Sequence, residues 1–247
     1  MKNKITIGVI GYGRFGKLWT SCLTSFGTIL VHDKRGVSAR IPRGVRFANL
    51  EEVVKTDMLF LLVPISQIES CCRDIAPLLQ KHTLVIDGCS VKLHPARLMK
   101  KLLPKNQPLI ATHPLFGPDS GKNGVAGKKI VLHRLRATPH QMKVFESMLK
   151  TLGLVLIHAT PLQHDKAMAR SQALVHLIGR SLEPLRLRQQ RISTPDYESL
   201  LSMQTMVRHD SWQLFSDMQH YNPYTRAIRK KLFTTLTSIE KSLIPSP

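Results

Sequence analysis

The sequence predicts an α/β protein with an N-terminal doubly wound, Rossmann-type parallel sheet and a C-terminal all-helical domain. Three observations support this prediction. Apolar β-type runs alternate with helical stretches up to about residue 160, those runs are almost continuously apolar, and they stop after residue 160. Continuously apolar strands are typical of a parallel sheet that is buried on both faces. Alternation of strand and helix is typical of a doubly wound fold.

The expected elements of the first domain follow from these apolar runs. We expect strands over 4–11, 27–33, 57–64, 82–88, 108–114, 128–133 and 154–160. We expect helices over 14–26, 66–80, 93–103 and 139–152. The first domain therefore covers residues 1–160.

The second domain, residues 161–247, is predicted to contain three helical stretches. The first covers 161–189, and Pro184 should kink or interrupt it. The second covers 193–221, with Ser193 or Thr194 as its cap and Pro195 in its first turn. The third covers 222–243, with Asn222 as its cap. A helical domain this small and this rich in Met and Leu is expected to cover its apolar faces by forming a homodimer.

Composition excludes several classes of protein. Hydrophobic residues make up 43% of the chain, which excludes a disordered protein, and no apolar run is long enough to span a membrane. No targeting segment is apparent, so we expect a cytoplasmic location. The four cysteines form no CxxC pair, and we expect neither disulfides nor a metal site.

The net charge of +20 is the unusual feature of the composition. Basic proteins often bind nucleic acid. Here the densest basic groups, 186–191 and 226–231, contain no interleaved aromatic residues, so we favour solvated helix faces over a nucleic-acid site. A positive field would also attract a small dianion, as an enzyme acting on carboxylates requires.

The segment "VIGYGRFG" has the G-x-G-x-x-G spacing of a dinucleotide-binding loop. It follows an expected strand and precedes an expected helix. Glycines at these positions permit a tight turn and let the backbone approach a pyrophosphate, and the helix N-terminus attracts the phosphates. The candidate cofactor-binding residues here are Gly11, Tyr12, Gly13, Arg14, Phe15 and Gly16.

Residues after two other strands are also expected to contact the cofactor. Asp33 ends the second strand, where an acidic group can bind both ribose hydroxyls, and this favours NAD. Lys34 and Arg35 follow and could instead hold the 2′-phosphate of NADP, which remains the alternative. Val63 and Pro64 end a further strand and are expected to lie against the cofactor.

Polar side chains follow two more strands at the same edge of the sheet. "VIDGCSVK" supplies Ser90 and Lys92, and "IATHPLFGPDSGK" supplies His113, Ser120 and Lys122. In open α/β sheets the ligand lies beyond the carboxyl ends of the strands. A histidine there can accept an alcohol proton as hydride leaves the same carbon. A serine can orient that histidine and the substrate hydroxyl, and lysines can bind carboxylates as point charges.

Together these segments resemble the prephenate and arogenate dehydrogenases of tyrosine biosynthesis. The resemblance rests on "GYGRFG", "IDGCSVK", "THPLFGPDSGKNG", "QHDKAMARSQALVHLIGR" and "YESLLSMQTMVRHDSWQLFSDMQHYN", and it covers nearly the whole chain. The "THPLFGPDSGK" and "HD…SQ…H…GR" segments are most similar to the plant-type arogenate branch.

The resemblance implies roles for individual residues. His113 matches the catalytic histidine that removes the ring-hydroxyl proton, and Ser90 matches the serine that supports it and touches the substrate. His164 and Asp165 match the "HD" pair that opens the helical domain, and His176 matches the second histidine of that helix. These three either line the pocket, fix the hinge between the domains, or have a purely structural role.

The resemblance leaves the substrate open. Arg208 lies near, but out of clean register with, the helical-domain arginine that binds a substrate carboxylate in many bacterial members. Asp210 matches the acidic residue of the plant-type pattern "GDSF" and would suit the ammonium group of arogenate. Arg208 and the positive charge favour prephenate instead. The candidate substrate-binding residues are Ser120, Lys122, His164, Arg208 and Asp210.

The expected function is therefore NAD(P)-dependent oxidative decarboxylation of prephenate or arogenate, with a small-molecule substrate and no nucleic-acid or membrane partner. One alternative is another dehydrogenase of a small hydroxy acid, built from a Rossmann domain and a helical domain. That alternative predicts a lysine base on the helical domain and leaves "HPLFGPDSG" unexplained. The other alternative is a non-catalytic basic module that binds nucleic acid.

Overall fold

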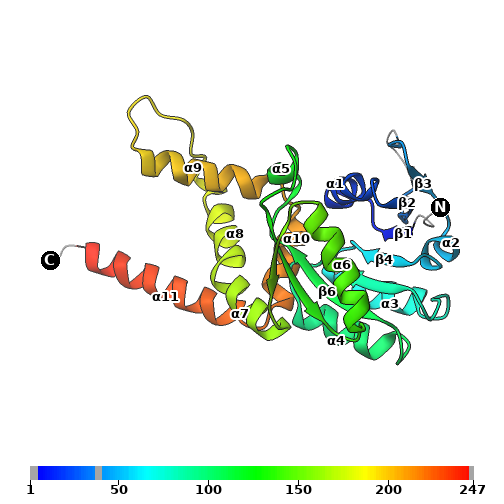
Figure 1. Ribbon diagram of the computed structural model, residues 1–247. Coiled ribbons are helices and arrows are strands. Elements are labelled where there is room, and N and C mark those ends of the chain that lie inside the picture. Colours follow the sequence, from blue (N-terminus) through cyan, green and yellow to red (C-terminus); the bar gives the residue numbers. More distant parts are fainter. Residues whose placement is uncertain (1–4, 37–40, 245–247) are drawn as a thin grey trace. The chain divides into compact units, whose positions relative to one another are not determined.

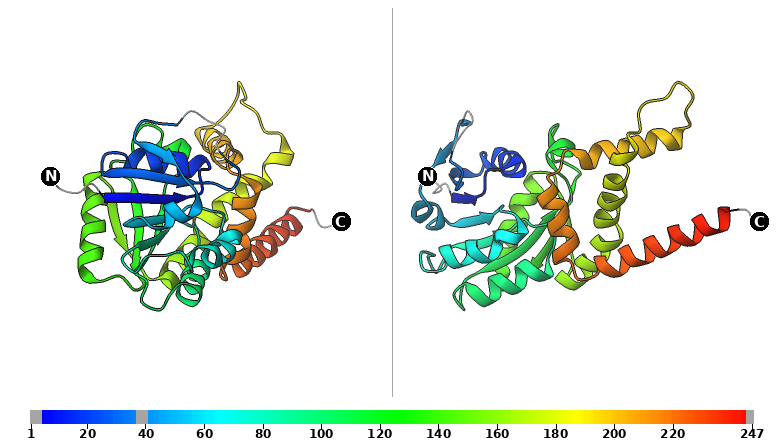
Figure 2. Two further views of the ribbon diagram at one scale, coloured as in Figure 1. Left: turned by 90° about the vertical axis from the view of Figure 1, so that its right-hand side faces the viewer. Right: turned by 180° about the vertical axis from the view of Figure 1, so that it is seen from behind.

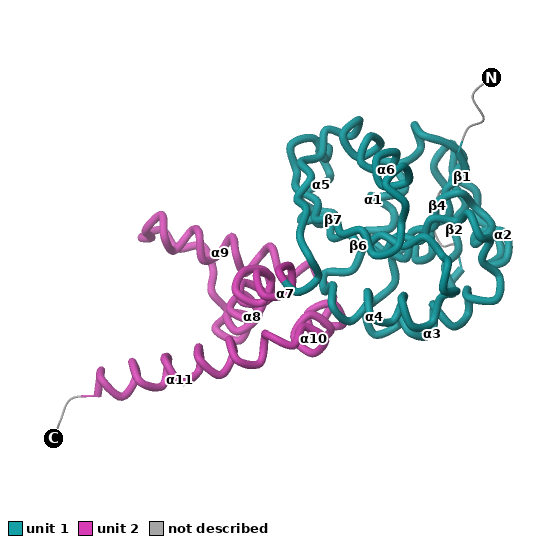
Figure 3. Tube along the Cα trace, turned by 60° about the horizontal axis from the view of Figure 1, so that its bottom comes forward, with its two compact units in different colours: residues 1–162 teal, residues 163–247 magenta. Residues whose placement is uncertain are grey.

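The structure is a computed structural model that describes residues 5–36 and 41–244. The chain divides into two compact units, residues 1–162 and residues 163–247 (Figure 3). The boundary expected after residue 160 lies two residues before this division.

The first unit is built on an eight-stranded sheet with the strand order β3-β2-β1-β4-β5-β6-β7-β8 (Figure 1). Neighbouring strands are parallel except for β6 and β7, which are antiparallel. The strands are β1 (Ile5–Ile10), β2 (Gly27–His32), β3 (Val45–Phe47), β4 (Met58–Leu61), β5 (Leu84–Asp87), β6 (Leu109–Pro114), β7 (Lys129–Arg134) and β8 (Val155–His158).

The prediction of a doubly wound α/β fold on a parallel sheet is confirmed, with one antiparallel pairing, β6–β7, that was not predicted. A parallel connection needs a crossover element long enough to return the chain to the same edge. Between these two strands the chain contains only the four-residue helix α5 (Pro118–Gly121), so it turns back and pairs antiparallel. The strand β3 and the helix α2 (Leu50–Val54) were not predicted, because three and five residues give too short a periodic pattern.

Helices cover both faces of the sheet (Figures 1 and 2). The helices α1 (Arg14–Leu23) and α6 (Pro139–Thr151) lie on one face, and α2, α3 (Ile68–Ile75) and α4 (Leu93–Leu102) lie on the other. Trp19 and Phe145 extend from the first pair into a core with Phe60 of the sheet, and all three are almost fully buried. Because helices cover both faces of the sheet, the carboxyl ends of the parallel strands are the place left for polar chemistry.

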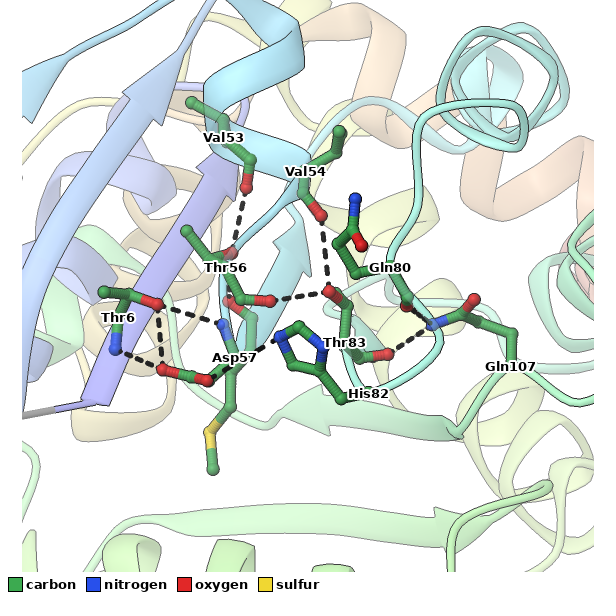
Figure 4. A network of polar contacts seen from close by, with 10 residues as sticks. Thr6, Val53, Val54, Thr56, Asp57, Gln80, His82, Thr83 and Gln107 are labelled. Atoms are coloured by element: carbon green, nitrogen blue, oxygen red, sulfur yellow. Dashed lines mark hydrogen bonds and ion pairs between the residues drawn. The ribbon is translucent and has the colours of Figure 1, made fainter. Parts of the chain in front are cut away.

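The amino ends of the central strands are joined by a network of polar contacts (Figure 4). The Asp57 carboxylate, directly before β4, accepts hydrogen bonds from the backbone N–H and the hydroxyl of Thr6 at 2.7 and 2.8 Å. The Thr83 hydroxyl, directly before β5, donates to the carbonyl oxygen of Thr56 at 2.7 Å. The Gln107 amide donates to the carbonyl oxygen of Gln80 at 3.1 Å. These side chains use their hydrogen-bonding groups on one another and on nearby backbone, so the amino ends of the strands have a structural role.

The second unit contains helices only. They are α7 (Pro161–Arg170), which begins at the end of the first unit, α8 (Gln172–Ser181), the 3₁₀ helix η2 (Glu183–Leu185), α9 (Pro195–Arg208), α10 (Trp212–Tyr221) and α11 (Thr225–Leu243). The all-helical prediction is confirmed. Among the described residues no helix is long and apolar enough to cross a membrane.

Two predicted helices are each divided in two. The stretch 161–189 is interrupted at Ser171, whose backbone angles are not helical, and it ends at Ser181 before a 3₁₀ turn that contains Pro184. The stretch 193–221 is interrupted at 209–211, where the Ser211 hydroxyl caps α10 by accepting a hydrogen bond from the Leu214 N–H at 3.1 Å. A cap residue inside a periodic pattern offers the backbone an alternative to the helix, and periodicity alone does not reveal it.

The two predicted caps have different outcomes. Thr194 is the N-cap of α9 and accepts a hydrogen bond from the Tyr197 N–H at 3.3 Å, which confirms one of the two residues proposed. Asn222 is wrong as the cap of the last helix. It follows α10, its side chain accepts from the Tyr224 N–H at 3.0 Å, and α11 begins at Thr225.

Candidate functional site

The glycine loop lies directly after β1, and its three glycines have different local requirements. Gly11 has a φ of +100°, and a Cβ there would lie 2.4 Å from the Leu62 carbonyl oxygen. A Cβ at Gly16 would lie 2.2 Å from the carbonyl oxygen of Gly11. Both positions therefore exclude a side chain for packing reasons.

Gly13 has open space above its backbone instead. A Cβ there would meet only Arg35 Nη2, at 3.8 Å. Gly13 is also the N-cap of α1 and gives this helix no side-chain cap. The first-turn N–H groups of a helix have no acceptor within the helix and attract anions. An open backbone at an uncapped helix N-terminus can therefore receive a phosphate group.

The Asp33 carboxylate lies beside this loop, directly after β2. It accepts hydrogen bonds from the backbone N–H of Tyr12 at 2.7 Å, the backbone N–H of Arg35 at 2.9 Å and the Arg35 guanidinium at 3.1 Å. Burial acts to raise the pKa of this carboxyl, but the hydrogen bonds from Arg35 and Tyr12 and the Arg35 charge outweigh it and lower the pKa to about 2. Asp33 is therefore a fixed negative charge at the edge of the loop.

The two basic residues after Asp33 are exposed. The Lys34 ammonium pairs with Asp74 of α3 at 2.9 Å, and the Arg35 side chain is 76% exposed although its guanidinium contacts Asp33. Arg35 can therefore leave Asp33 without disturbing buried structure. The backbone of Leu62 and Val63, after β4, lies close to Gly11, because a Cβ added at Gly11 would lie 3.2 Å from the Val63 nitrogen. Pro64 is exposed.

Ser90 and His113 lie at the carboxyl ends of the neighbouring parallel strands β5 and β6. Ser90 lies three residues beyond Asp87, and His113 is the penultimate residue of β6. Both residues are buried, with exposed fractions of 8% and 4%. The Ser90 hydroxyl is buried and has no hydrogen-bond partner among the described residues. An unbonded buried hydroxyl is uncommon, because the group loses its bonds to water.

Lys92 is almost fully buried near the same strand ends, at the start of α4. Its ammonium donates hydrogen bonds to the carboxylate of Asp87 and to the carbonyl oxygen of Thr112 at 2.5 Å. Lys92 is therefore not open to a substrate carboxylate as a point charge. Asp87 was not among the predicted site residues, although a single acidic residue at the end of the apolar run "LVID" is a signal of a buried charge.

The loop after β6 packs against the nucleotide-loop helix. Arg14 and Asp119 form an ion pair at 2.8 Å, and the Phe15 and Phe116 rings lie 6.2 Å apart. Ser120 and Lys122 are exposed, and the Ser120 hydroxyl accepts a hydrogen bond from the Gly117 N–H at 3.0 Å, which stabilises the turn itself. The "HPLFGPDSG" segment thus supports the helix α1 through Phe116 and Asp119.

In the helical unit, His164 and Asp165 are both buried, and His164 Nδ1 lies 2.7 Å from Asp165 Oδ1. The Asn222 side chain donates to the Asp165 carbonyl oxygen at 2.8 Å, which joins α7 to the end of α10. This pair therefore takes part in the internal packing of the helices.

His176, Arg208 and Asp210 lie on neighbouring parts of the same unit. His176 Nε2 is 3.7 Å from Asp210 Oδ2, and burial lowers the pKa of His176 although Asp210 opposes this effect. The Arg180 guanidinium donates to the Asp210 carbonyl oxygen. Arg208, the last residue of α9, is exposed. The described residues contain no group of three or more His, Cys, Asp or Glu side chains that could hold a metal ion.

Comparison with protein families gives two matches. The family model described as "Prephenate dehydrogenase, nucleotide-binding domain" matches residues 27–158, and a model described as "TYRAAT1-like, C-terminal domain" matches residues 181–246. The first match covers more than half of the chain.

Two curated relatives from Arabidopsis thaliana match almost the whole chain. "Arogenate dehydrogenase 2, chloroplastic" is 30% identical over 97% of this chain and 70% of its own length. "Arogenate dehydrogenase 1, chloroplastic" is 27% identical over 98% of this chain and 39% of its own length. This chain is thus shorter than both relatives.

Solved structures share the fold. A prephenate dehydrogenase from A. aeolicus, in complex with hydroxyphenyl propionate and NAD+, has a TM-score of 0.74 at 17% identity and covers 96% of this chain and 90% of its own. The arogenate dehydrogenase of Synechocystis has a TM-score of 0.66 at 20% identity and covers 96% of this chain and 93% of its own.

Proposed function

The chain belongs to the prephenate dehydrogenase family, and we propose that it catalyses the NAD(P)-dependent oxidative decarboxylation of prephenate or arogenate in tyrosine biosynthesis. The observation that carries this proposal is that His113 and the unbonded, buried Ser90 hydroxyl lie at the ends of neighbouring strands, on the side of the sheet that also bears the glycine loop.

The residues at this edge fit a nicotinamide dinucleotide. Open space at Gly13, the uncapped start of α1 and the ionised Asp33 supply a phosphate site and a ribose acceptor. When bound, the nicotinamide ring accepts a hydride. We propose NAD as the preferred cofactor because Asp33 is negatively charged, and we propose that Arg35 and Lys34 allow NADP as the weaker alternative.

His113 acts as the general base in this proposal, and Ser90 hydrogen-bonds to the substrate hydroxyl. The substrate is a cyclohexadienol with a ring carboxylate opposite the hydroxyl. His113 takes the hydroxyl proton as the carbinol carbon is oxidised, and the carboxylate then leaves as CO2 because the ring becomes aromatic. A positioned base contributes about 10²–10⁴-fold to such a rate. The remainder must come largely from orientation of the substrate.

The proton balance of this reaction assigns a second task to His113. Loss of hydride and of CO2 from the substrate accounts for the whole change in composition, so no net proton is released. The proton that His113 removes from the hydroxyl is therefore returned to the oxygen of the phenolic product. His113 holds the proton during the reaction and must stay close to this oxygen throughout.

Two residues of the helical unit bear on substrate choice. Asp210 carries a carboxylate that attracts the ammonium group of arogenate, and the exposed Arg208 attracts the keto-acid of prephenate. We therefore propose both compounds as candidate substrates. Ser120, Lys122 and His164 stay predicted substrate-binding residues.

We propose that the protein is a homodimer through the helical unit. One face of α11 carries large apolar side chains that are more than half exposed: Phe233, Leu236, Ile239 and Leu243. Their spacing of three or four residues puts them on one stripe of the helix. An apolar stripe of this length is typical of a contact between protein chains, and a second copy offers the same stripe.

We propose that the high positive charge attracts the carboxylates of the substrate, and we propose no nucleic-acid partner. A cytoplasmic location stays a prediction.

Initial rates with purified protein test the proposed function. Prephenate and arogenate are each paired with NAD and with NADP, and the absorbance of the reduced nicotinamide is followed. We expect turnover with at least one pair and a higher kcat/KM with NAD than with NADP. Absence of turnover with all four pairs, for folded protein that binds nucleotide, would favour the dehydrogenase of another hydroxy acid.

A further inference from the structure

A buried ion pair, shielded from solvent, lies close in the chain to the proposed catalytic residues. Asp87 is fully buried and Lys92 is 1% exposed. The Lys92 ammonium contacts the Asp87 carboxylate and the Thr112 carbonyl oxygen. Removing two charges from water is costly, and buried ion pairs can often be replaced by apolar residues without loss of stability. The pair therefore calls for an explanation other than stability.

The contacts of the pair converge on Thr112, the residue before His113. The Thr112 N–H donates to the Asp87 carboxylate at 3.3 Å, and its hydroxyl donates to the Asp87 carbonyl oxygen at 2.6 Å. With the bond from Lys92 to the Thr112 carbonyl oxygen, all three polar groups of this threonine are bound by the pair. The Asp87 carboxylate also accepts from the N–H of Cys89 at 3.2 Å, beside Ser90.

These contacts begin where the backbone ladder stops. The register between β5 and β6 ends at the pair Asp87 and Ala111, because the chain leaves β5 to enter α4. Beyond this point the backbone groups of Thr112 have no neighbouring strand on the β5 side and need side-chain partners. Asp87 and Lys92 supply these partners. Their side chains therefore continue the hydrogen bonding of the sheet as far as Thr112, the residue before His113.

We propose that Asp87 and Lys92 are positioning residues that fix Ser90 and His113 relative to each other. This inference rests on the proposed function of Ser90 and His113. The pair acts through Cys89 and Thr112, each one residue from a proposed catalytic group. Catalysis by orientation is sensitive to small displacements, since a misplacement of about 1 Å can cost about 10²-fold in rate.

The test compares two threonine variants that differ in position only. Thr112→Val removes the bond from the Thr112 hydroxyl to the Asp87 carbonyl oxygen (2.6 Å), and Thr83→Val removes the bond from the Thr83 hydroxyl to the Thr56 carbonyl oxygen (2.7 Å) at the opposite edge (Figure 4). Both side chains are buried. We expect similar losses of Tm, a kcat about 3- to 10-fold lower for Thr112→Val only, and an unchanged KM for nucleotide. Equal kcat values in the two variants would overturn the proposal.

A second comparison separates positioning from stability. Lys92→Met leaves the Asp87 carboxylate buried and unpaired, and we expect a large loss of Tm. The double variant Asp87→Asn/Lys92→Met carries no buried charge, so its Tm should return close to the wild-type value. We expect its kcat to stay about 10- to 100-fold below wild type. Recovery of kcat together with Tm would show that the pair is only structural.

Hydrogen–deuterium exchange gives a readout that does not need turnover. We expect peptides covering 88–92 and 110–115 to exchange faster in the double variant than in wild type, and peptides covering 4–9 and 56–60 to be unchanged. If wild type is inactive with every substrate, the proposed function fails while exchange still tests the positioning role. Unchanged exchange at both strand ends would contradict that role.

Discussion

The Asp33 carboxylate accepts a 2.7 Å hydrogen bond from the backbone N–H of Tyr12, the second residue of the glycine loop. This contact joins the end of β2 to the turn after β1, and it holds the proposed ribose acceptor in place before any cofactor binds. Because the bond goes to the charged form of the carboxyl, it links the geometry of the loop to the ionisation of Asp33.

Asp33 should contribute to stability in a pH-dependent way. Its pKa is lowered to about 2 from an ordinary value of 3.8, so the stabilisation is present above pH 3.8 and is lost as the pH falls through 2. The shift corresponds to about 2 kcal/mol of unfolding free energy. Urea unfolding at pH 5 and pH 2.5 should show that Asp33→Asn destabilises the protein at pH 5 and much less at pH 2.5. Equal destabilisation at both values would exclude an ionised Asp33 as the source.

Substitutions at Asp33 and Arg35 should change cofactor preference in opposite directions. Asp33→Asn removes the charge that attracts the ribose hydroxyls and repels a 2′-phosphate, so the ratio of kcat/KM for NAD to that for NADP should fall about 10-fold or more. Arg35→Gln removes the exposed guanidinium and should raise the same ratio. The steady-state kinetics of both variants with both cofactors check this prediction, which fails if both ratios move the same way.

His113→Asn should abolish proton transfer while nucleotide binding persists. Because a positioned base contributes about 10²–10⁴-fold, kcat should fall by this factor. Nucleotide affinity, followed by fluorescence titration, should stay within about twofold of wild type. His82→Asn serves as the control, since His82 is exposed and lies at the opposite edge of the sheet (Figure 4). A His113→Asn variant with wild-type kcat would remove His113 from the mechanism.

Ser90→Ala should separate activity from stability. The Ser90 hydroxyl is buried without a partner among the described residues, so its removal should leave Tm unchanged or raise it slightly. In the proposed complex the hydroxyl bonds to the substrate hydroxyl. Its removal leaves that group without a partner, which costs about 1–3 kcal/mol and corresponds to a loss of about 5- to 160-fold in kcat/KM.

Thr20→Val is the matched control for that variant. The Thr20 hydroxyl, in α1, is also buried and unbonded within the described part of the chain. Thermal melts and initial rates should show similar Tm effects for the two variants and a loss of kcat/KM for Ser90→Ala only. A comparable loss in Thr20→Val would mean that the effect does not arise from substrate contact.

A charge on the exposed stripe of α11 should dissociate the proposed dimer. Leu236 is 52% exposed in the middle of the stripe, and Leu236→Glu would bury a charge at a contact between two copies. Light scattering should give twice the 27.9 kDa chain mass for wild type and a single chain mass for the variant. Ser238→Glu, at an exposed position on the opposite side of α11 from the stripe, should keep the wild-type mass. A monomeric wild type would contradict the dimer.

Much of the fold could be predicted from the sequence, because long periodic or apolar segments reflect burial directly. The runs that became β1, β4 and β5 are enclosed on both faces, and nothing in their surroundings competes with the strand conformation. The prediction failed where one local contact decides the structure. Ser211 interrupts a periodic helical pattern by capping α10, and the antiparallel pairing of β7 follows from a short connection rather than from strand composition.

The candidate site divides in a similar way. The sequence spacing alone was enough to find Gly11, Gly13 and Asp33, because the proposed roles of these residues depend on the local backbone of the loop. The role of the Asp87 and Lys92 pair could not be found in this way, because it depends on contacts with Thr112, which is 20 or more residues away in the sequence. Sequence spacing indicates that a lysine is near the site, but not whether its ammonium faces the substrate or a buried carboxylate.

The most direct test of the central claim is the stoichiometry of the reaction. Purified protein is given substrate labelled with ¹⁴C at the ring carboxylate, and released CO2 is counted against reduced nicotinamide over the same interval. Oxidative decarboxylation predicts one CO2 for each reduced nicotinamide formed. Reduced nicotinamide without CO2 would contradict the account and identify a simple hydroxy-acid dehydrogenase.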